Sequence, residues 1–232
     1  MRQRVATAAA NIDPVIGVAI STWRRPDTLA LALNEWARRL AGVSLLVVNH
    51  DEQGRGVAET KNAGLAALMA DPRITDLFLA DDDVSPIADD WARPYVQSPH
   101  PHLMHCWGAN RYEREIDGHT IWSWPRGVLL YARRAVVERV GGMRPDFGPV
   151  GGEHVEWSRR VHNCGFTPHP FMDVAGSNRL WCYDTTAPTT LPKTRYTDRR
   201  WKTRRQRLLE SYRHSTEHVA LPLPAHQLTS PL

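Results

Sequence analysis

At 232 residues the chain is long enough for one substantial α/β domain with an extension, because single hydrophobic cores commonly grow to this size. It lacks a run of roughly 20 apolar residues that could span a membrane and lacks the apolar core of a signal peptide, so we expect a cytoplasmic protein. Three widely spaced cysteines argue against a disulfide framework and against a closed zinc site. The net charge of +4 is uneven, since residues 193–214 hold nine Lys or Arg and two Asp or Glu, a net of +7 that leaves −3 for the remainder.

The first part of the chain alternates between predicted strands and helices. An apolar, β-branched run at 15–20 predicts a buried strand, and the polar turn after it leads to a helix that Asp27 or Thr28 could cap. A second strand at 44–48, a second helix at about 58–70 and a third strand at 76–80 follow. This alternation predicts a mostly parallel, doubly wound α/β sheet of the Rossmann-like kind.

The second part of the chain is less regular. Residues 91–124 are rich in Trp, His and Pro, which is typical of binding loops. A strand at 128–131 and helices at 134–140 and from about 153 to 165 come next. We expect one domain over residues 1–190 and a basic helical extension over 191–232. Four aromatic residues could form a stacking platform for a sugar or a base, or could pack in the core: Trp107, Trp122, Trp124 and Trp181.

Asp81, Asp82 and Asp83 follow the third predicted strand directly. In doubly wound sheets ligands bind at the carboxyl ends of the strands, where the polar segments 22–25 and 49–56 also fall. Three adjacent carboxylates repel one another unless a cation compensates them, and Mn²⁺ or Mg²⁺ prefers oxygen ligands. The pattern therefore indicates a metal-dependent site, with a helix cap or a solvated turn as the alternative.

A second polar cluster lies at residues 151–161, which read GGEHVEWSRRV. Glu153, His154 and Glu156 fall in the first turn of a predicted helix, where two preceding glycines allow a ligand to approach the backbone. Such a group suits acid and base catalysis. The alternative is an ordinary acidic first turn in which Glu156 and Arg160 form an exposed pair.

These segments together resemble glycosyltransferases with the GT-A fold, in particular the family 2 enzymes and relatives with a galactosyltransferase-like C-terminal half. The match runs over residues 15–165 in the right order. It rests on VAISTWRRP at 18–26, TKNAG at 60–64, LADDDV at 79–84, which is similar to the D-x-D element, and residues 141–161, which resemble a G-G-E-D/N-x-E/D motif.

The resemblance implies transfer of a sugar from a nucleoside-diphosphate sugar to a hydroxyl, with Mn²⁺ or Mg²⁺ as cofactor. The implied donor-binding residues are Thr22, Arg25, Asn49, Asp51, Lys61, Asp81 and Asp82, and the implied metal ligands are Asp83 and Asp81. Glu153 would hold hydroxyl groups, and the catalytic base would come from Glu153, His154 or Glu156. Rival interpretations are nucleotidyl transfer and a non-catalytic nucleic-acid-binding module on a degenerate GT-A fold.

The chain departs from the family pattern in three places. Asn49 and His50 stand where relatives carry acidic residues, which leaves the base of the donor open. His154 stands where inverting relatives carry a catalytic Asp. The later metal-binding His of many relatives is missing at 175–179, and His162 or His169 could take its place.

The basic segment near the C-terminus carries an apolar stripe, Trp201, Leu208 and Tyr212, at positions i, i+7 and i+11. Docking of this stripe would expose Arg199, Arg200, Lys202, Arg204 and Arg207. Such a face could follow the phosphates of DNA or an anionic membrane surface, or could simply be solvated. The preferred acceptor is accordingly a hydroxylated base in DNA, followed by a protein or a lipid-linked glycan.

Overall fold

The computed structural model describes residues 13–106, 112–148, 151–183 and 198–223. Its centre is a five-stranded sheet in the order β2-β1-β3-β8-β5. The strands are β1 (Ile16–Thr22), β2 (Val43–His50), β3 (Asp76–Asp81), β8 (Leu129–Arg133) and β5 (His102–His105). β1 pairs in parallel with β2 and β3, whereas β8 is antiparallel to β3 and β5, so four of the strands run the same way. The predicted mostly parallel α/β sheet is confirmed.

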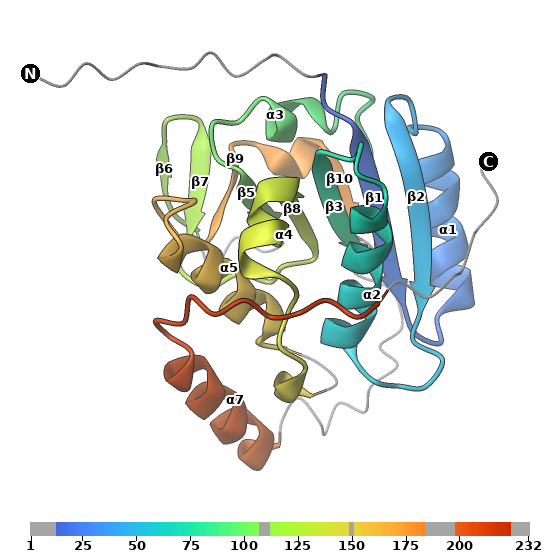
Figure 1. The fold of residues 1–232 in the computed structure, drawn as a ribbon. Helices are drawn as coiled ribbons and strands as arrows, with labels where there is room; N and C mark the ends of the chain where they lie inside the picture. Colours follow the sequence, from blue (N-terminus) through green and yellow to red (C-terminus); the bar gives the residue numbers. More distant parts are fainter. Residues whose placement is uncertain (1–12, 107–111, 149–150, 184–197, 224–232) are drawn as a thin grey trace, which may run out of the picture.

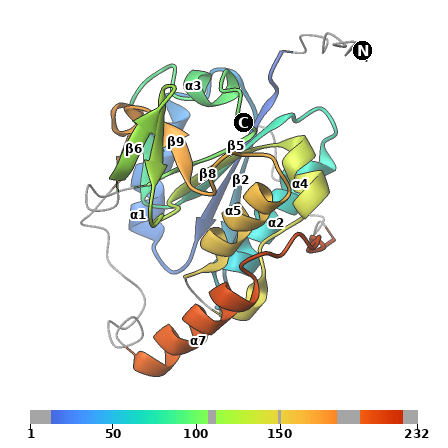
Figure 2. The same cartoon turned by 90° about the vertical axis from the view of Figure 1, so that its left-hand side faces the viewer.

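Helices cover both faces of this sheet (Figure 1). The apolar sides of α2 (Val57–Ala70), α4 (Arg134–Val140) and α5 (Glu153–Asn163) pack on one face. On the other face lies α1 (Pro26–Ala37). Figure 2 shows the sheet between these two layers. No helix among the described segments is long and apolar enough to cross a bilayer.

The region 91–124 forms regular structure rather than the predicted set of loops. It contains α3 (Arg93–Val96), β5 and the hairpin β6 (Tyr112–Ile116) and β7 (His119–Trp122), and β7 pairs with β9 (Met172–Val174). Trp91 and Tyr95 pack in the core on the same sheet face as α1, whereas Trp122 and Trp124 are partly buried against the core on the other face. Trp181 belongs to this aromatic cluster and donates to the Tyr95 hydroxyl at 2.9 Å, so it forms no ligand platform, and Trp107 lies outside the described residues.

Two boundaries also differ from the sequence expectation. α1 begins at Pro26 with Arg25 in the capping position, so neither Asp27 nor Thr28 caps it, because proline is well suited to the first helical turn. β2 continues to His50, which places Asn49 inside the strand rather than in the loop after it.

Residues beyond 197 pack against the helical layer. The helix α7 (Arg199–Ser211) turns Leu209 into the core, with Leu208 and Tyr212 packed beside it, and Trp201 lies against Gly151, so the docking of the apolar stripe is confirmed. The segment 212–221, here called the C-terminal strap, then crosses α4 and α5 towards α2 (Figure 1). Backbone hydrogen bonds join Val219 to Val140 and Gly142.

Candidate active site

A tight turn after β3 carries the acidic cluster and leads into β4 (Val84–Pro86). Asp82 is fully buried and accepts a hydrogen bond from the Thr22 hydroxyl at 2.5 Å. The Arg25 guanidinium pairs with the same carboxylate. Because the carboxylate of Asp82 is occupied in this way, it joins the end of β1 to the acidic turn. In this structure the Asp82 carboxylate is thus paired with Thr22 and Arg25, and the predicted donor contacts of Thr22 and Asp82 stay a prediction.

Asp81 and Asp83 present the remaining carboxylates of the turn. Lys61 of α2 is almost fully buried, and its Nζ lies 2.6 Å from Oδ1 of Asp81. Arg25 Nη1 lies 2.8 Å from Oδ2 of Asp83, while Oδ1 of Asp83 is buried with no hydrogen-bond partner among the described residues. Burial and the charge of Asp81 raise the pKa of Asp83 to about 6. The negative charge of Asp83 is thus only partly compensated by Arg25, and no described residue donates a hydrogen bond to its Oδ1.

The first turn of α5 supplies a carboxylate and imidazole pair. His154 Nδ1 lies 3.1 Å from Oε1 of Glu153, whereas Oε2 of Glu153 and Nε2 of His154 are buried without a partner in the part of the chain that the structure describes. Burial alone would raise the pKa of Glu153, but the hydrogen bond and charge of His154 outweigh it, and that pKa is lowered. Glu153 therefore stays ionised and orients the ring of His154. Gly127, with φ at +37°, lets the segment before β8 lie directly against this ring.

Lys61 links the two clusters electrostatically. Lys61, which pairs with Asp81, also lowers the pKa of Glu153 by its charge, so the β3 turn and the α5 turn are within electrostatic reach of one another. Tyr183 lies close enough to the same carboxylates to feel their charge. Burial raises the pKa of its hydroxyl, and the charges of Asp83 and Asp81 raise it further.

Tyr183 and Arg126 are site residues that the sequence prediction missed. β10 (Trp181–Tyr183) pairs with β4, which puts Tyr183 opposite Val84, the residue after Asp83. The charge of Arg126 acts on the Tyr183 hydroxyl, so Arg126 lies nearby. Neither residue sits in a motif, and the pairing of strands so distant in sequence leaves no local signal.

Asn49 and Asp51 lie at the end of β2, next to the loop after β1. Both carboxylate oxygens of Asp51 accept backbone N–H groups, from Arg55 and Gly56, at 2.8 Å each, so Asp51 fixes the loop that leads into α2. The side-chain amide of Asn49 packs against Gly64, and its Nδ2 has no partner among the described residues. Of the two, Asn49 is the one with a free hydrogen-bonding group.

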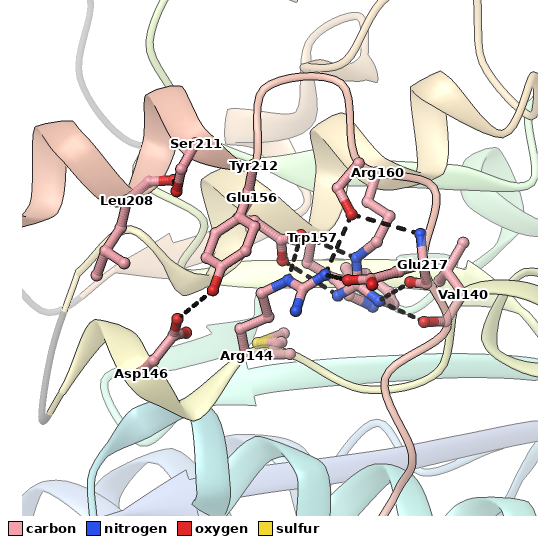
Figure 3. Close-up of polar contacts among 12 residues, drawn as sticks. Val140, Arg144, Asp146, Glu156, Trp157, Arg160, Leu208, Ser211, Tyr212 and Glu217 are labelled. Carbon is pink, nitrogen blue, oxygen red and sulfur yellow. Dashed lines mark hydrogen bonds and ion pairs between the residues drawn. The ribbon is translucent and has the colours of Figure 1, made fainter.

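Glu156 does not face this site, in contrast to its predicted role as a candidate base. It is buried, and Arg160 donates to its two oxygens at 2.9 and 3.1 Å (Figure 3). Arg144 lies 3.2 Å from the same carboxylate. Arg160 also donates to the carbonyl groups of Val140, Gly142 and Glu217. The expected exposed Glu156–Arg160 pair is therefore a buried network that fixes α5, the end of α4 and the C-terminal strap together.

The histidines proposed as additional metal ligands lie elsewhere. His162, near the end of α5, contacts the carbonyl of Thr167 at 2.7 Å. His169 acts electrostatically on His100, which lies just before β5, and the start of β5 is level with the Asp76 end of β3, opposite to the Asp81 end. Within the described ranges no group of three or more His, Cys, Asp or Glu side chains is arranged to hold a metal ion. Asp81 and Asp83 remain, and two carboxylates suffice for an ion such as Mg²⁺ when substrate phosphates complete its coordination.

The comparisons with known proteins identify the fold. No protein-family model matches the sequence, and no curated protein matches it. The structure is similar to the catalytic domain of Drosophila β1,4-galactosyltransferase 7 in a complex with xylobiose, with a TM-score of 0.54 and 17% identity over 80% of this chain and 74% of that one. It is also similar to a mannosyltransferase from Pyrobaculum calidifontis in a complex with GDP-Man and Mn²⁺, with a TM-score of 0.52 and 16% identity over 87% of this chain and 63% of that one.

A mutant of the same Drosophila galactosyltransferase, in a complex with manganese, UDP-Gal and xylobiose, gives a TM-score of 0.51 at 17% identity over 80% of this chain and 79% of that one. At such identities the similarity establishes the architecture and not the substrate. This chain has the GT-A fold, as its sequence predicted.

Proposed function

We propose that this protein is a glycosyltransferase that moves a sugar from a nucleoside-diphosphate sugar to an acceptor hydroxyl. One observation carries the proposal. Three buried polar atoms without partners among the described residues, Asp83 Oδ1, Glu153 Oε2 and His154 Nε2, belong to two clusters that lie within electrostatic reach of one another through Lys61. Buried polar atoms are nearly always satisfied in native proteins, so these unpartnered atoms support a ligand between the two clusters.

The donor side of the site is the acidic turn. Bound at Asp83 and Asp81, a Mn²⁺ or Mg²⁺ ion would neutralise the negative charge that develops on the departing diphosphate. Arg25 and Lys61 already balance these carboxylates and lie where they could pair with phosphate oxygens. The galactosyltransferase and the mannosyltransferase hold UDP-Gal and GDP-Man, which are both nucleoside-diphosphate sugars. Asn49 is the residue we propose for contact with the base.

The acceptor side is the first turn of α5. We assign the general base to His154, because Glu153 holds its Nδ1 and leaves Nε2 without a partner among the described residues. In the transfer, Nε2 takes the proton of the acceptor hydroxyl and the acceptor oxygen forms a bond to the anomeric carbon. The bond from that carbon to the diphosphate oxygen breaks, and its electron pair leaves with the nucleoside diphosphate.

The acceptor that we propose is a hydroxylated base in DNA. The net charge of +7 over residues 193–214 against −3 for the remainder supports it, because a basic surface attracts the phosphate backbone of a nucleic acid.

Ligand-induced stabilisation tests the donor assignment. A panel of nucleotide sugars, each with and without Mn²⁺, should contain one that raises the melting temperature by about 5–10 °C at ~100 times its dissociation constant, in the presence of the metal only. Release of nucleoside diphosphate rather than pyrophosphate on turnover separates sugar transfer from nucleotidyl transfer. A protein that binds no nucleotide sugar under any condition, yet binds DNA, would be the non-catalytic module instead.

The variant His154→Gln tests the base. It should lower kcat by roughly 10²–10⁴-fold, the usual contribution of a positioned base, while the stabilisation by nucleotide sugar and Mn²⁺ is retained. The activity is measured in parallel with His162→Gln, which alters a histidine whose Nδ1 contacts the Thr167 carbonyl away from the two clusters. Equal kcat values for the two variants would exclude His154 as the base.

A further inference from the structure

We propose that the outward face of α7 binds the phosphate backbone of the nucleic-acid acceptor directly beside the candidate catalytic turn. The outward face comprises Arg199, Arg200, Thr203 and Arg207, flanked by Lys202 and Arg204, all of them exposed. The inference rests on the proposed function and assigns its acceptor to one surface.

The charge of this face is unbalanced. α7 carries six Lys or Arg residues and the single acid Glu210, which pairs with Arg213 at 3.4 Å. In the described part of the chain none of Arg199, Arg200, Lys202 and Arg207 takes part in an ion pair with an acidic side chain. Arginine presents a planar set of donors that matches two phosphate oxygens at once. A row of exposed arginines without counter-charges is the kind of surface that a polyanion neutralises.

A hollow of about 830 Å³ lies along the same helix. Its lining includes Arg199, Arg200, Arg204 and Arg207, with the hydroxyl groups of Thr203 and Ser211 and the partly buried side chain of Leu208. The carboxylate there, Asp198, is engaged by the backbone N–H of Arg200 at 2.8 Å. The lining therefore offers donors to an anionic ligand.

The distribution of apolar residues favours a nucleic acid over a lipid surface. A helix that binds in the membrane interface buries an apolar face in the bilayer. In α7 the apolar residues point the other way, since Leu209 is in the core, Leu208 packs beside it, and Trp201 covers Gly151. The exposed side has only polar and charged residues. Such a face can contact phosphates but has nothing to insert among lipid chains.

The inward side of α7 packs next to the candidate catalytic turn. Trp201 packs on Gly151, and Arg205 packs on Gly152, the residue before Glu153. The Arg205 guanidinium also stacks between Trp201 and Trp124, 4.8 and 5.6 Å from their ring centroids. Trp124 lies in the segment before β8 that touches His154 through Gly127. A polynucleotide held on the outward face of α7 therefore lies one helix width, roughly 10–12 Å, from the turn that carries the residue we assign as the base.

A binding experiment tests the proposal without requiring turnover. The triple variant Arg199→Gln/Arg200→Gln/Arg207→Gln is compared with Arg38→Gln/Arg73→Gln/Arg93→Gln, which removes the same charge from exposed positions on other elements. Affinity for a short DNA duplex and for its single strands is measured by fluorescence anisotropy over a series of salt concentrations, with vesicles of anionic phospholipid as the second probe. Each protein is also melted with nucleotide sugar and Mn²⁺.

The wild-type protein and the control triple should bind DNA with similar affinity. The α7 triple should bind about tenfold more weakly or worse near 0.1 M salt, with a salt slope smaller by about 2–3, since each phosphate contact contributes about 0.9. Its stabilisation by nucleotide sugar should be unchanged, which shows that the fold and the donor site are intact. The proposal is overturned if wild-type protein binds no DNA, if the α7 triple binds DNA as tightly as the control, or if vesicles are bound in preference to DNA. The donor assignment survives all three results, so the two proposals fail separately.

Discussion

The variant Asp83→Asn is expected to abolish sugar transfer while making the ligand-free protein more stable. The loss of turnover should be about 10³-fold or more, because the variant removes the carboxylate that would hold the metal, whose stabilisation of transition-state charge is worth several kcal/mol. The ligand-free protein should gain stability because the variant removes a buried negative charge. Asp83 is buried beside Asp81, and Arg25 only partly offsets this.

The sign of the stability effect depends on the pKa of Asp83, which is raised from 3.8 to about 6 in the folded protein. Between about pH 4 and pH 6 the folded state therefore holds a proton that the unfolded chain has released, and the free energy of unfolding falls as the pH rises. Above about pH 6 the charged form costs the folded protein on the order of 1–3 kcal/mol, which asparagine does not incur.

Urea unfolding in the presence of a chelator measures the effect. The free energies of unfolding of wild-type protein and Asp83→Asn should differ little near pH 4 and by the full amount at pH 7.5. Asp89→Asn serves as control, since the Asp89 side chain is 98% exposed and lies 3.6 Å from Arg39, so little change is expected there. Retained turnover in Asp83→Asn would remove Asp83 from the metal site, and an unchanged stability at pH 7.5 would contradict the burial of an under-compensated carboxylate.

The sequence predicted the parts of the fold that depend on local patterns. Apolar runs, rich in β-branched residues in β1, identified β1, β2 and β3 because buried parallel strands tend to be apolar on both faces. The pair of glycines before Glu153 marked the start of α5, where both adopt positive φ. The same local patterns placed Asp81 and Glu153 at ends of elements that the fold brings together, whereas Lys61 was implied only by the resemblance to GT-A glycosyltransferases.

The remainder of the site depends on contacts that no local pattern encodes. Tyr183 reaches the acidic turn only because β10 pairs with β4. The aromatic residues between 91 and 124 looked like ligand-binding groups, since composition alone does not separate a buried Trp from one that lines a pocket. Asp82 resembled its two neighbours in sequence, and only the folded structure turns it inward towards Thr22.

Glu156 is the sharpest example of this ambiguity. Glu153, His154 and Glu156 occupy the same helical turn, and their spacing alone leaves all three open as bases. In the structure the first two have atoms without partners among the described residues, while both oxygens of Glu156 are bound by arginines (Figure 3). The same helical turn thus carries both the residues that we assign to catalysis and one that holds the chain together.

We therefore expect Glu156→Gln to lower stability and to spare catalysis. Replacing the carboxylate leaves Arg160, which is fully buried, without its counter-charge, and breaking a buried pair in this way costs about 3–5 kcal/mol. For a chain of this size the melting temperature should fall by roughly 6–20 °C. The C-terminal strap should exchange its amide hydrogens faster, because the two arginines that hold Ser215 and Glu217 are the ones that Glu156 positions.

The catalytic rate of Glu156→Gln should be nearly unchanged. Measured below the melting range with saturating donor, kcat of Glu156→Gln should stay within about threefold of wild type, because the carboxylate has no route to the acceptor. Glu210→Gln is the matched control, since Glu210 pairs only with Arg213 at the surface and its loss should cost less than about 1 kcal/mol. If Glu156→Gln instead loses turnover as His154→Gln does, and melts like the Glu210→Gln control, then Glu156 is the base and the network around Arg160 is not what fixes α5 to the strap.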